Sequence, residues 1–267
     1  MVDRIDLDGT GLRYRRLRVD ETSVLADRTP VLLLHPWFGC QAMWDPLAQR
    51  LDRPSYAVDW YSLADGGARA WEPWASPHGL ARAALALLDD QRLDRVDVIG
   101  NSVGGIVAQV LAAHHPERVR RLVLIGTGAS LDGAPSAFGA LVSRWIEHPE
   151  QRKELAGRLV DALVAQPHPP AARDEYVAAV LAADPEFLAA VLQAARRTDL
   201  RPALGAITAR TLVIRGEHDT ARTAEHVAVL TAGIRRAEAV EMAGCGHSPM
   251  VEDPDAVAAL VLSHLRD

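Results

Sequence analysis

The sequence contains little lysine and little cysteine, and each shortage excludes a class of chemistry. The only lysine among 267 residues is Lys153, which lies in the polar run from Glu147 to Glu154. A Schiff-base enzyme and a lysine-bearing phosphate loop both need a lysine in a defined setting, and this chain offers none. A disulfide framework or a zinc site would need more cysteines, at closer spacing, than Cys40 and Cys245. We expect both cysteines to be small buried residues, and we expect no metal and no cofactor.

Excess positive charge and long apolar runs are also missing. The formal net charge is −6 and the pI is about 5.9, whereas binding to a phosphate backbone demands a basic surface. The first eight residues carry acids where a signal peptide would need an apolar core. The apolar run 256–262 is far shorter than the ~20 residues that span a bilayer. We therefore expect a cytoplasmic protein with no nucleic-acid partner and no membrane association.

The chain does have enough apolar sequence for one full core, since 49% of its residues are hydrophobic. Residues 3–18 alternate around the turn 8–11, which predicts an N-terminal hairpin at the antiparallel edge of a sheet. Beyond it, apolar strands alternate with helices, which predicts an α/β fold with a mostly parallel sheet flanked by helices. The expected strands are 31–34, 56–60, 96–99, 119–126, 211–216 and 237–242, and the expected helices are 43–51, 80–88, 103–115 and 254–265.

The interval from Ser130 to Ala209 breaks this alternation, because it contains helical stretches and no convincing strand. A helical insert in an alternating chain is best placed over the carboxyl edge of the sheet, where ligands bind in open α/β folds. We assign residues 1–129 and 205–267 to the core and 130–204 to a helical cap inserted after the sixth strand. The alternative is that these helices extend the core. The helical stretches are 138–146, 151–165, 173–182 and 185–196.

Ser102 lies between two glycines, where a predicted strand meets a predicted helix. A serine at this junction requires a very sharp turn. Glycine at positions 100 and 104 permits the turn, because a Cβ there would clash with the neighbouring strand or helix. The pattern is the Gly-x-Ser-x-Gly nucleophile elbow, which presents a serine hydroxyl for attack. Taken alone, the pattern is equally compatible with an ordinary loop that carries a capping serine. The choice between the two interpretations therefore depends on the residues that could act with Ser102.

A serine hydroxyl is a weak nucleophile that needs a histidine base, and the histidine needs an acid to fix its tautomer. On a sheet of this type the chain order is serine, acid, histidine, each at the carboxyl end of a strand. Asp219 and His247 each follow one of the last two predicted strands. The loop after the sixth strand offers Thr127 where an acid would be needed. We predict Ser102, Asp219 and His247 as catalytic residues, with Glu217 as the second choice of acid.

The oxyanion of a tetrahedral intermediate requires backbone N–H donors that are already in place. Val103, directly after the nucleophile and at a helix N-terminus, supplies the first donor. Pro36 has no N–H, so Trp37 is the first donor in the loop after the third strand. We predict Phe38 in this loop and Trp145 in the helical interval as substrate-binding residues. Simple loop packing is the alternative for Trp37 and Phe38.

These motifs resemble the α/β-hydrolase superfamily from about residue 28 to the end. Within it the chain is most similar to small capped hydrolases: enol-lactonases, carboxylesterases, acyl-homoserine lactonases and carbon–carbon bond hydrolases. The resemblance implies the fold and the triad and says little about the substrate. The matching stretches are Leu34-His35-Pro36-Trp37-Phe38-Gly39, Met43-Trp44-Asp45-Pro46-Leu47, Gly100-Asn101-Ser102-Val103-Gly104-Gly105, Arg215-Gly216-Glu217-His218-Asp219 and residues 246–254 around His247.

The chain departs from its relatives in two places. Relatives carry His-Gly where this chain has His35-Pro36, which puts the shape of that loop in doubt, and we expect His35 to pack structurally. Relatives often carry Asp-x-Arg-Gly-His-Gly-x-Ser where this chain has the segment 59–67. Nearby tryptophans are candidates for a different pocket rim, with core packing as the alternative. They are Trp60, Trp71 and Trp74.

The leading hypothesis is a serine hydrolase that cleaves a small, hydrophobic ester or lactone through an acyl-enzyme. The first alternative is a hydrolase of a carbon–carbon bond in a dienol acid, which would need a cationic clamp for the substrate carboxylate. The candidates for that clamp are Arg144, Arg196 and Arg197. The alternative is that these arginines are solvated surface residues. The second alternative is a receptor that keeps the hydrolase fold. The sequence leaves the oligomeric state open.

Overall fold

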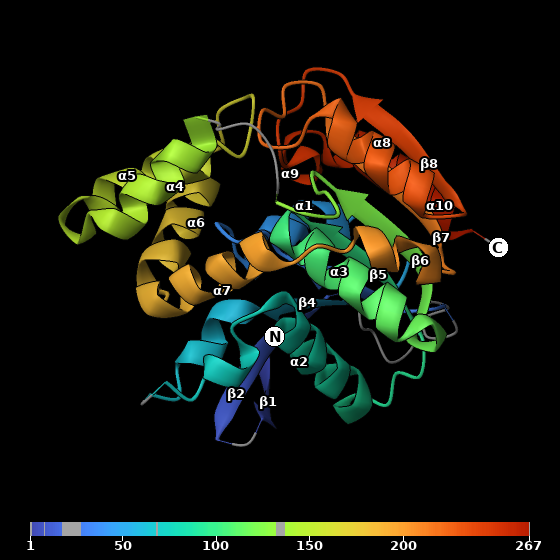
Figure 1. Cartoon of the computed structure of the whole chain (residues 1–267), viewed down its shortest axis with the longest axis horizontal. Coiled ribbons are helices and arrows are strands. Elements are labelled where there is room, and N and C mark those ends of the chain that lie inside the picture. The colour runs from blue at the N-terminus through green and yellow to red at the C-terminus, as the bar shows by residue number, and fades with distance from the viewer. Residues whose placement is uncertain (1, 8, 18–27, 68, 132–136, 267) are drawn as a thin grey trace.

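A computed structural model of the chain describes residues 2–7, 9–17, 28–67, 69–131 and 137–266. The chain folds around one eight-stranded sheet in the order β1-β2-β4-β3-β5-β6-β7-β8 (Figure 1). Strands β1, β2 and β4 pair antiparallel, and all pairs from β4 to β8 are parallel. The bounds are β1 (Val2–Leu7), β2 (Thr10–Leu17), β3 (Val31–Leu34), β4 (Ser55–Asp59), β5 (Val96–Asn101), β6 (Val119–Ile125), β7 (Arg210–Gly216) and β8 (Ala237–Met242). The predicted α/β fold and its N-terminal hairpin are confirmed.

The two central strands β3 and β5 are buried along their whole length. Their apolar runs fit this position, because a parallel strand with helices on both faces reads as continuously hydrophobic rather than alternating. The carboxyl ends of β5, β7 and β8 meet at one edge of the sheet. The chain therefore brings the loops after these strands together, although they are far apart in sequence.

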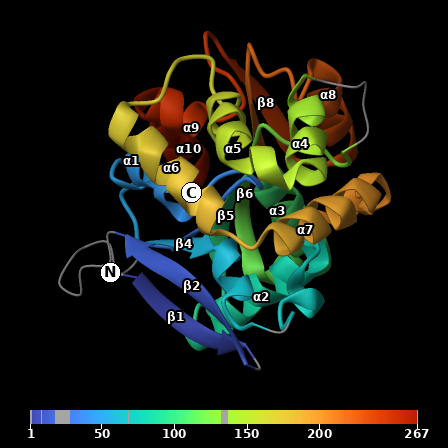
Figure 2. The same ribbon diagram turned by 90° about the vertical axis from the view of Figure 1, so that its left-hand side faces the viewer.

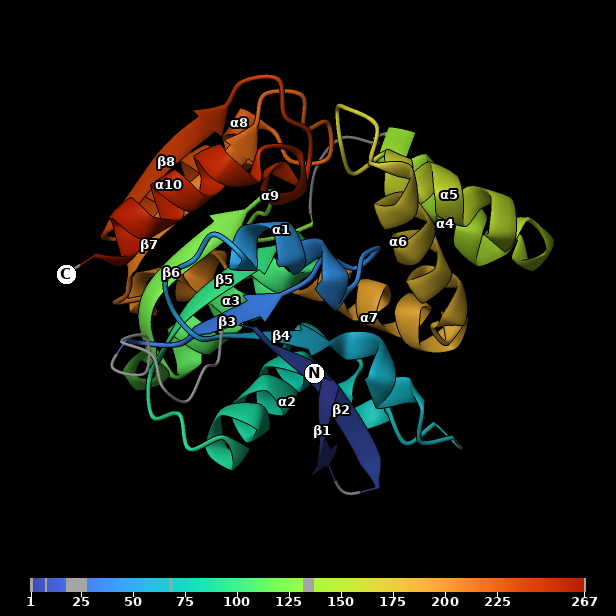
Figure 3. The same cartoon turned by 180° about the vertical axis from the view of Figure 1, so that it is seen from behind.

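Helices cover both faces of the sheet. The first face carries α2 (Pro77–Asp90), α3 (Val103–His114) and α8 (Ala224–Gly233) (Figure 1). The opposite face carries α1 (Asp45–Ala48), α9 (Pro249–Glu252) and α10 (Pro254–Leu265), seen in Figure 3. Sequence analysis missed α8, and the reason is that only Leu230 in it is buried, so the helix has no continuous apolar stripe.

Four helices between β6 and β7 form an insert at one end of the sheet, which faces the viewer in Figure 2. They are α4 (Ala137–Glu147), α5 (Arg152–Asp161), α6 (Pro170–Ala182) and α7 (Pro185–Arg197). Within the described residues of this interval the only β pairing is an isolated bridge between Ser130 and Asp199. We call α4–α7 the helical insert. The assignment of residues 130–204 as a separate cap remains a prediction.

Two predicted helices are shorter in the structure. The stretch 43–51 divides into a 3₁₀ turn and α1, because Pro46 lacks an N–H and fits only the first turn of a new helix. The stretch 151–165 ends at Asp161, and the N–H of Ala165 donates to Glu252 instead of to the helix. The 3₁₀ segments are Gln41–Trp44, Trp60–Ala64, Glu72–Trp74, Pro116–Arg118, Pro149–Gln151 and Arg201–Ala206.

Within the described part of the chain, no single helix has both the length and the apolar composition to cross a membrane. Helices α6 and α7 satisfy the two criteria only as a pair bent by 92°. Cys40 and Cys245 are both buried free thiols, as expected.

Candidate active site

The backbone at Ser102 adopts a conformation that residues with a Cβ rarely occupy, with φ 55° and ψ −118°. Such a conformation costs about 1–3 kcal/mol and persists only where its surroundings enforce it. A Cβ on Gly100 would overlap the backbone of Gly104, and a Cβ on Gly104 would overlap the backbone of Leu34. The Thr127 hydroxyl donates to the Ser102 carbonyl over 2.8 Å. The strand–turn–helix geometry of the nucleophile elbow is therefore present at Ser102.

Asp219 and His247 form a buried pair at the carboxyl ends of β7 and β8. The Nδ1 atom of His247 lies 2.8 Å from Oδ2 of Asp219, and the two residues are only 4% and 3% exposed. The other carboxylate oxygen of Asp219 accepts from the N–H groups of Ala221 and Arg222, both at 2.9 Å. Burial alone would raise the pKa of Asp219, but the His247 charge and these hydrogen bonds together hold it below its ordinary value.

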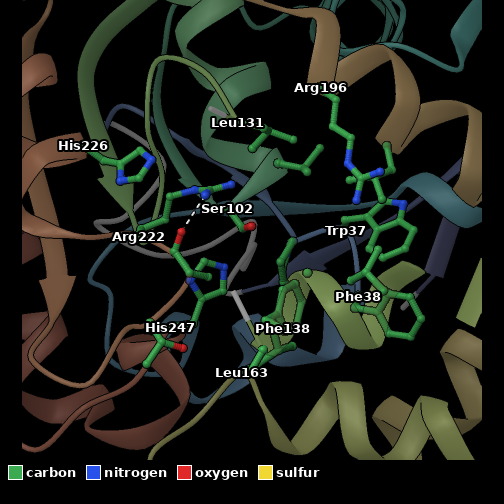
Figure 4. Close-up of a pocket in the computed structure, with 18 of the residues that line it drawn as sticks. Trp37, Phe38, Ser102, Leu131, Phe138, Leu163, Arg196, Arg222, His226 and His247 are labelled. Atoms are coloured by element: carbon green, nitrogen blue, oxygen red, sulfur yellow. Dashed lines mark hydrogen bonds between the residues drawn. The ribbon is translucent and has the colours of Figure 1, made fainter. Parts of the chain in front are cut away.

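Ser102 and His247 both line one cavity of about 530 Å³, between the edge of the sheet and the helical insert. In Figure 4 the His247 ring lies on the side of the cavity that holds Ser102. Among the described residues, the Ser102 hydroxyl makes no hydrogen bond. Catalytic hydrogen bonds are often long or misaligned without substrate. The structure thus joins the predicted acid to the predicted base and brings the predicted nucleophile to the same cavity.

Trp37 and Val103 also line this cavity. The N–H groups of both residues donate to no acceptor in the described part of the chain. Trp37 is held in place, because its indole Nε1 donates to the Leu188 carbonyl over 2.7 Å and its carbonyl accepts from the Tyr61 hydroxyl over 2.8 Å. Val103 is the first residue of α3, where the helix dipole favours negative charge. Two residues with unpaired backbone N–H groups therefore line the same cavity as Ser102.

The two predicted substrate-binding residues occupy different layers. Phe38 lines the cavity. Trp145, on α4, is not among the lining residues: it is buried behind Phe38, with the two rings perpendicular and their centroids 5.1 Å apart. The Arg152 guanidinium covers the Trp145 ring at 4.9 Å. Trp145 thus supports the cavity wall from behind, because its helix presents this side chain to the loop rather than to the open space.

A family comparison adds to this geometry. The model of the alpha/beta hydrolase family matches residues 31–260, which is most of the chain. The chain belongs to the alpha/beta hydrolase family. Its hydrolase relatives include a pimeloyl-[acyl-carrier protein] methyl ester esterase of Neisseria meningitidis serogroup B. The two are 30% identical over 250 residues, or 86% of this chain and 90% of that esterase.

A second relative of this α/β hydrolase is the 2-hydroxymuconate semialdehyde hydrolase of Pseudomonas sp. strain CF600. It is 30% identical over 184 residues, or 67% of this chain and 64% of that enzyme. The crystal structure of the enol-lactonase from Burkholderia xenovorans LB400 has a TM-score of 0.84 and 24% identity, covering 99% of this chain and 100% of the lactonase. That structural likeness supports the fold alone.

Three further groups of predicted candidates of this α/β hydrolase lie outside the cavity. Glu217, the second choice of acid, accepts from the N–H of Gly244 and lies 4.0 Å from the ring of His218, whereas His247 pairs with Asp219. His35 is fully buried, and its Nε2 accepts from the N–H of Trp60 over 3.1 Å. Burial lowers the pKa of His35. His35 is therefore packed inside the core, where we expected it. The three tryptophans 60, 71 and 74 do not belong to the residues that line the cavity.

Sequence analysis missed two residues that connect the site loops of this α/β hydrolase. Asn101 is fully buried, and its Nδ2 donates to the carbonyls of His247 and Ile125, both at 3.0 Å. Glu252 accepts from the N–H of Gly246 over 2.7 Å and from the N–H of Ala165 over 2.6 Å. Both residues belong to the matching stretches of the sequence, so the sequence did indicate that they lie near the site. It did not indicate their partners, because most of these partners lie far away in sequence.

Proposed function

We propose that this α/β hydrolase cleaves a carboxylic ester or lactone through an acyl-enzyme. The Ser102 oxygen attacks the carbonyl carbon while His247 takes the hydroxyl proton, and Asp219 stabilises the imidazolium that forms. The N–H groups of Trp37 and Val103 donate to the oxyanion. His247 then gives its proton to the leaving oxygen as the ester bond breaks. A water molecule, deprotonated by His247, attacks the acyl-enzyme, releases the acid and restores Ser102.

The observation that supports this proposal best is the strained turn at Ser102 opening on the same cavity as the buried Asp219–His247 pair. Strain of this kind is retained where it serves a site, since folding alone would favour a relaxed turn. The two unpaired N–H groups at Trp37 and Val103 lie on this cavity as well.

The apolar part of the cavity wall suggests a substrate with a hydrophobic portion. Several of its apolar side chains come from the helical insert and its flanks, so we infer that the insert acts as a cap that determines which substrates fit. The Neisseria relative, a methyl ester esterase, favours an ester over other carboxylic derivatives. The larger apolar lining residues from the insert and its flanks are Leu131, Phe138, Val142, Leu163 and Leu192.

The test is hydrolysis of 4-nitrophenyl esters together with labelling by a fluorophosphonate. We expect Ser102→Ala to abolish labelling and to lower kcat by at least about a thousandfold, because the nucleophile is removed. The matched control is Ser263→Ala, since Ser263 is exposed on α10 at a distance from the cavity. Labelling of the S102A variant at the wild-type rate, or no labelling of the wild type, would contradict the proposal.

A second candidate is hydrolysis of a carbon–carbon bond, favoured by the semialdehyde hydrolase relative from Pseudomonas. The same serine, histidine and oxyanion donors would serve a ketone carbonyl, but the leaving group would be a carbon rather than an oxygen. Turnover of a vinylogous diketone acid without turnover of a simple ester would favour this candidate. Turnover of the ester alone would exclude it.

A further inference from the structure

Two arginine side chains reach the proposed active-site cavity from different elements. Arg196 belongs to α7 of the helical insert, and Arg222 belongs to the loop that follows β7 and carries Asp219. In Figure 4 they approach the cavity from opposite sides, Arg196 beside Trp37 and Arg222 on the side of His226. The cavity therefore has one guanidinium on each of two opposite sides.

In the described part of the chain neither guanidinium forms an ion pair with an acid, and the charge of Asp219 acts on Arg222 without a direct contact between the side chains. Among the described residues the Arg196 side chain has no hydrogen bond and no ion pair. Arg222 donates from Nη1 to the Ala221 carbonyl over 2.6 Å, while its buried Nε has no partner. Some arginines of the helical insert do have acidic partners: Arg173, for example, forms two hydrogen bonds to Asp161 at 2.6 and 2.9 Å.

The cavity also lacks a negative group of its own. No aspartate or glutamate occurs among the described residues that line it. Asp219 lies behind the wall, where its carboxylate oxygens are occupied by His247 and two backbone N–H groups. Burial lowers the pKa of Arg222, because its guanidinium loses contact with water, and an incoming anion would offset this cost. Arg196 is exposed, so its guanidinium is accessible to an anion that enters the cavity. Low-dielectric walls also concentrate the positive potential in the cavity.

The structure selects one of the three clamp candidates found in the sequence. Arg144 donates to Gln151 on the exposed side of the insert, at 2.6 Å, and Arg197 does not line the cavity. Arg196 does line it. Arg222 was not a candidate, because nothing in the sequence shows that the loop after Asp219 turns back toward the cavity.

We propose that the substrate carries an ionised carboxylate in addition to the ester that is cleaved. Arg196, with its N–H donors uncommitted, binds that carboxylate in the bidentate arrangement that guanidinium favours. Arg222, held by its own loop, adds positive potential from the opposite wall. This inference rests on the proposed function and narrows it to monoesters of dicarboxylic acids and their lactone equivalents, with the apolar wall between the two ends contacting the carbon chain.

The experiment compares two substrates that differ only in charge: mono-4-nitrophenyl adipate and its primary amide, 4-nitrophenyl adipamate. We expect the wild type to prefer the adipate by about tenfold or more in kcat/KM, since hydrogen bonds to charged groups are the stronger ones. Arg196→Gln should lower kcat/KM for the adipate by about tenfold and leave the adipamate within about twofold. The double variant R196Q/R222Q should abolish the preference.

The control is Arg197→Gln, because Arg197 is the next residue of α7, is also exposed and does not line the cavity. This variant should change kcat/KM for neither ester. Equal kcat/KM for the two esters in the wild type, or an equal loss on both substrates in R196Q, would overturn the inference.

A binding measurement separates this inference from the proposed function. Calorimetry should show that adipate dianion binds to the Ser102→Ala variant. The binding should weaken in the double variant S102A/R196Q, and also when salt is raised from about 0.05 to 0.5 M. If the wild type hydrolyses neither ester but adipate binds through Arg196, the proposed function fails and the anion site stands. If both esters turn over equally and adipate does not bind, the anion site fails and the hydrolase stands.

Discussion

At the scale of single residues, Asn101 and Thr127 position the turn that carries Ser102. Asn101 connects three segments with one side chain, because it donates to Ile125 and His247 and accepts from the Ser248 hydroxyl at 3.1 Å. A buried amide with all these partners fixes the distance between the serine turn and the histidine loop. The geometry of the proposed triad thus depends on a residue that takes no part in proton transfer.

Asp219 gives a prediction for acid stability. Its folded-state pKa is held below the ordinary value of about 3.9. A carboxyl group with a depressed pKa stabilises the fold above its unfolded pKa, and this contribution is lost as pH falls through the folded value. We expect the difference in unfolding free energy between wild type and Asp219→Asn to be constant between pH 5 and 7 and to shrink below about pH 4.

Urea denaturation of both proteins at pH 7, 5, 4 and 3 measures this difference. Asp255→Asn serves as the control: Asp255 pairs with Arg50 at the surface, so its effect should be small at every pH. A difference between wild type and D219N that grows toward pH 3 would contradict the sign argued here.

At the scale of elements, Glu252 on α9 joins the histidine loop to the helical insert. Its two carboxylate oxygens accept from Gly246 on one side and from Ala165 and Gln166 on the other. The carboxylate therefore replaces the helical hydrogen bonds that α5 would need in order to continue beyond Asp161. It is a short connection between the core and the segment that follows α5.

We expect Glu252→Ala to loosen this connection without unfolding the protein. The N–H groups of residues 165 and 166 lie in exposed residues, so water replaces the carboxylate and the unfolding free energy should fall by only about 1 kcal/mol. Hydrogen exchange should accelerate at residues 163–166 and 244–247. The control is Glu117→Ala, because Glu117 lies in the turn before β6 and not in either of these segments. This variant should leave hydrogen exchange at both segments unchanged. Wild-type protection at both segments in E252A would contradict the connection.

At the scale of the whole molecule, an ion cluster lies at the amino end of the sheet, away from the proposed site. Asp97 in β5 is fully buried and accepts from Arg53 at 3.2 Å and from Arg120 at 2.9 and 2.7 Å. Arg120 also donates to the carbonyl of Leu265 at the end of α10. The cluster thus joins the centre of the sheet to the C-terminal helix.

We expect Asp97→Ala to lower the unfolding free energy by about 3 kcal/mol, because the partly buried Arg120 loses its counter-charge and the buried Arg53 keeps only Asp52. Urea denaturation measures the loss, and Asp255→Ala at an exposed pair should cost at most about 1 kcal/mol. The kcat of the folded fraction should match the wild type, since the cluster does not contact the cavity. A D97A protein of wild-type stability would contradict this account.

The sequence by itself determined the alternating architecture and the three residues of the proposed triad. The period of the apolar residues indicates which side chains are buried. The strand–Ser102–helix pattern involves only neighbouring residues, so it can be recognised from the sequence. The order of Ser102, Asp219 and His247 then follows from strand ends that share one edge of the sheet.

Only the tertiary structure decided which side chains line the cavity. Trp145 and Arg196 both lie on helices of the insert, and a helical period alone does not tell which face meets the core and which meets the open space. The packing of α4 buries Trp145 behind Phe38, whereas α7 brings Arg196 to the cavity. The contacts of Asn101 and Glu252 were likewise beyond the sequence, because the partners meet only when distant loops converge.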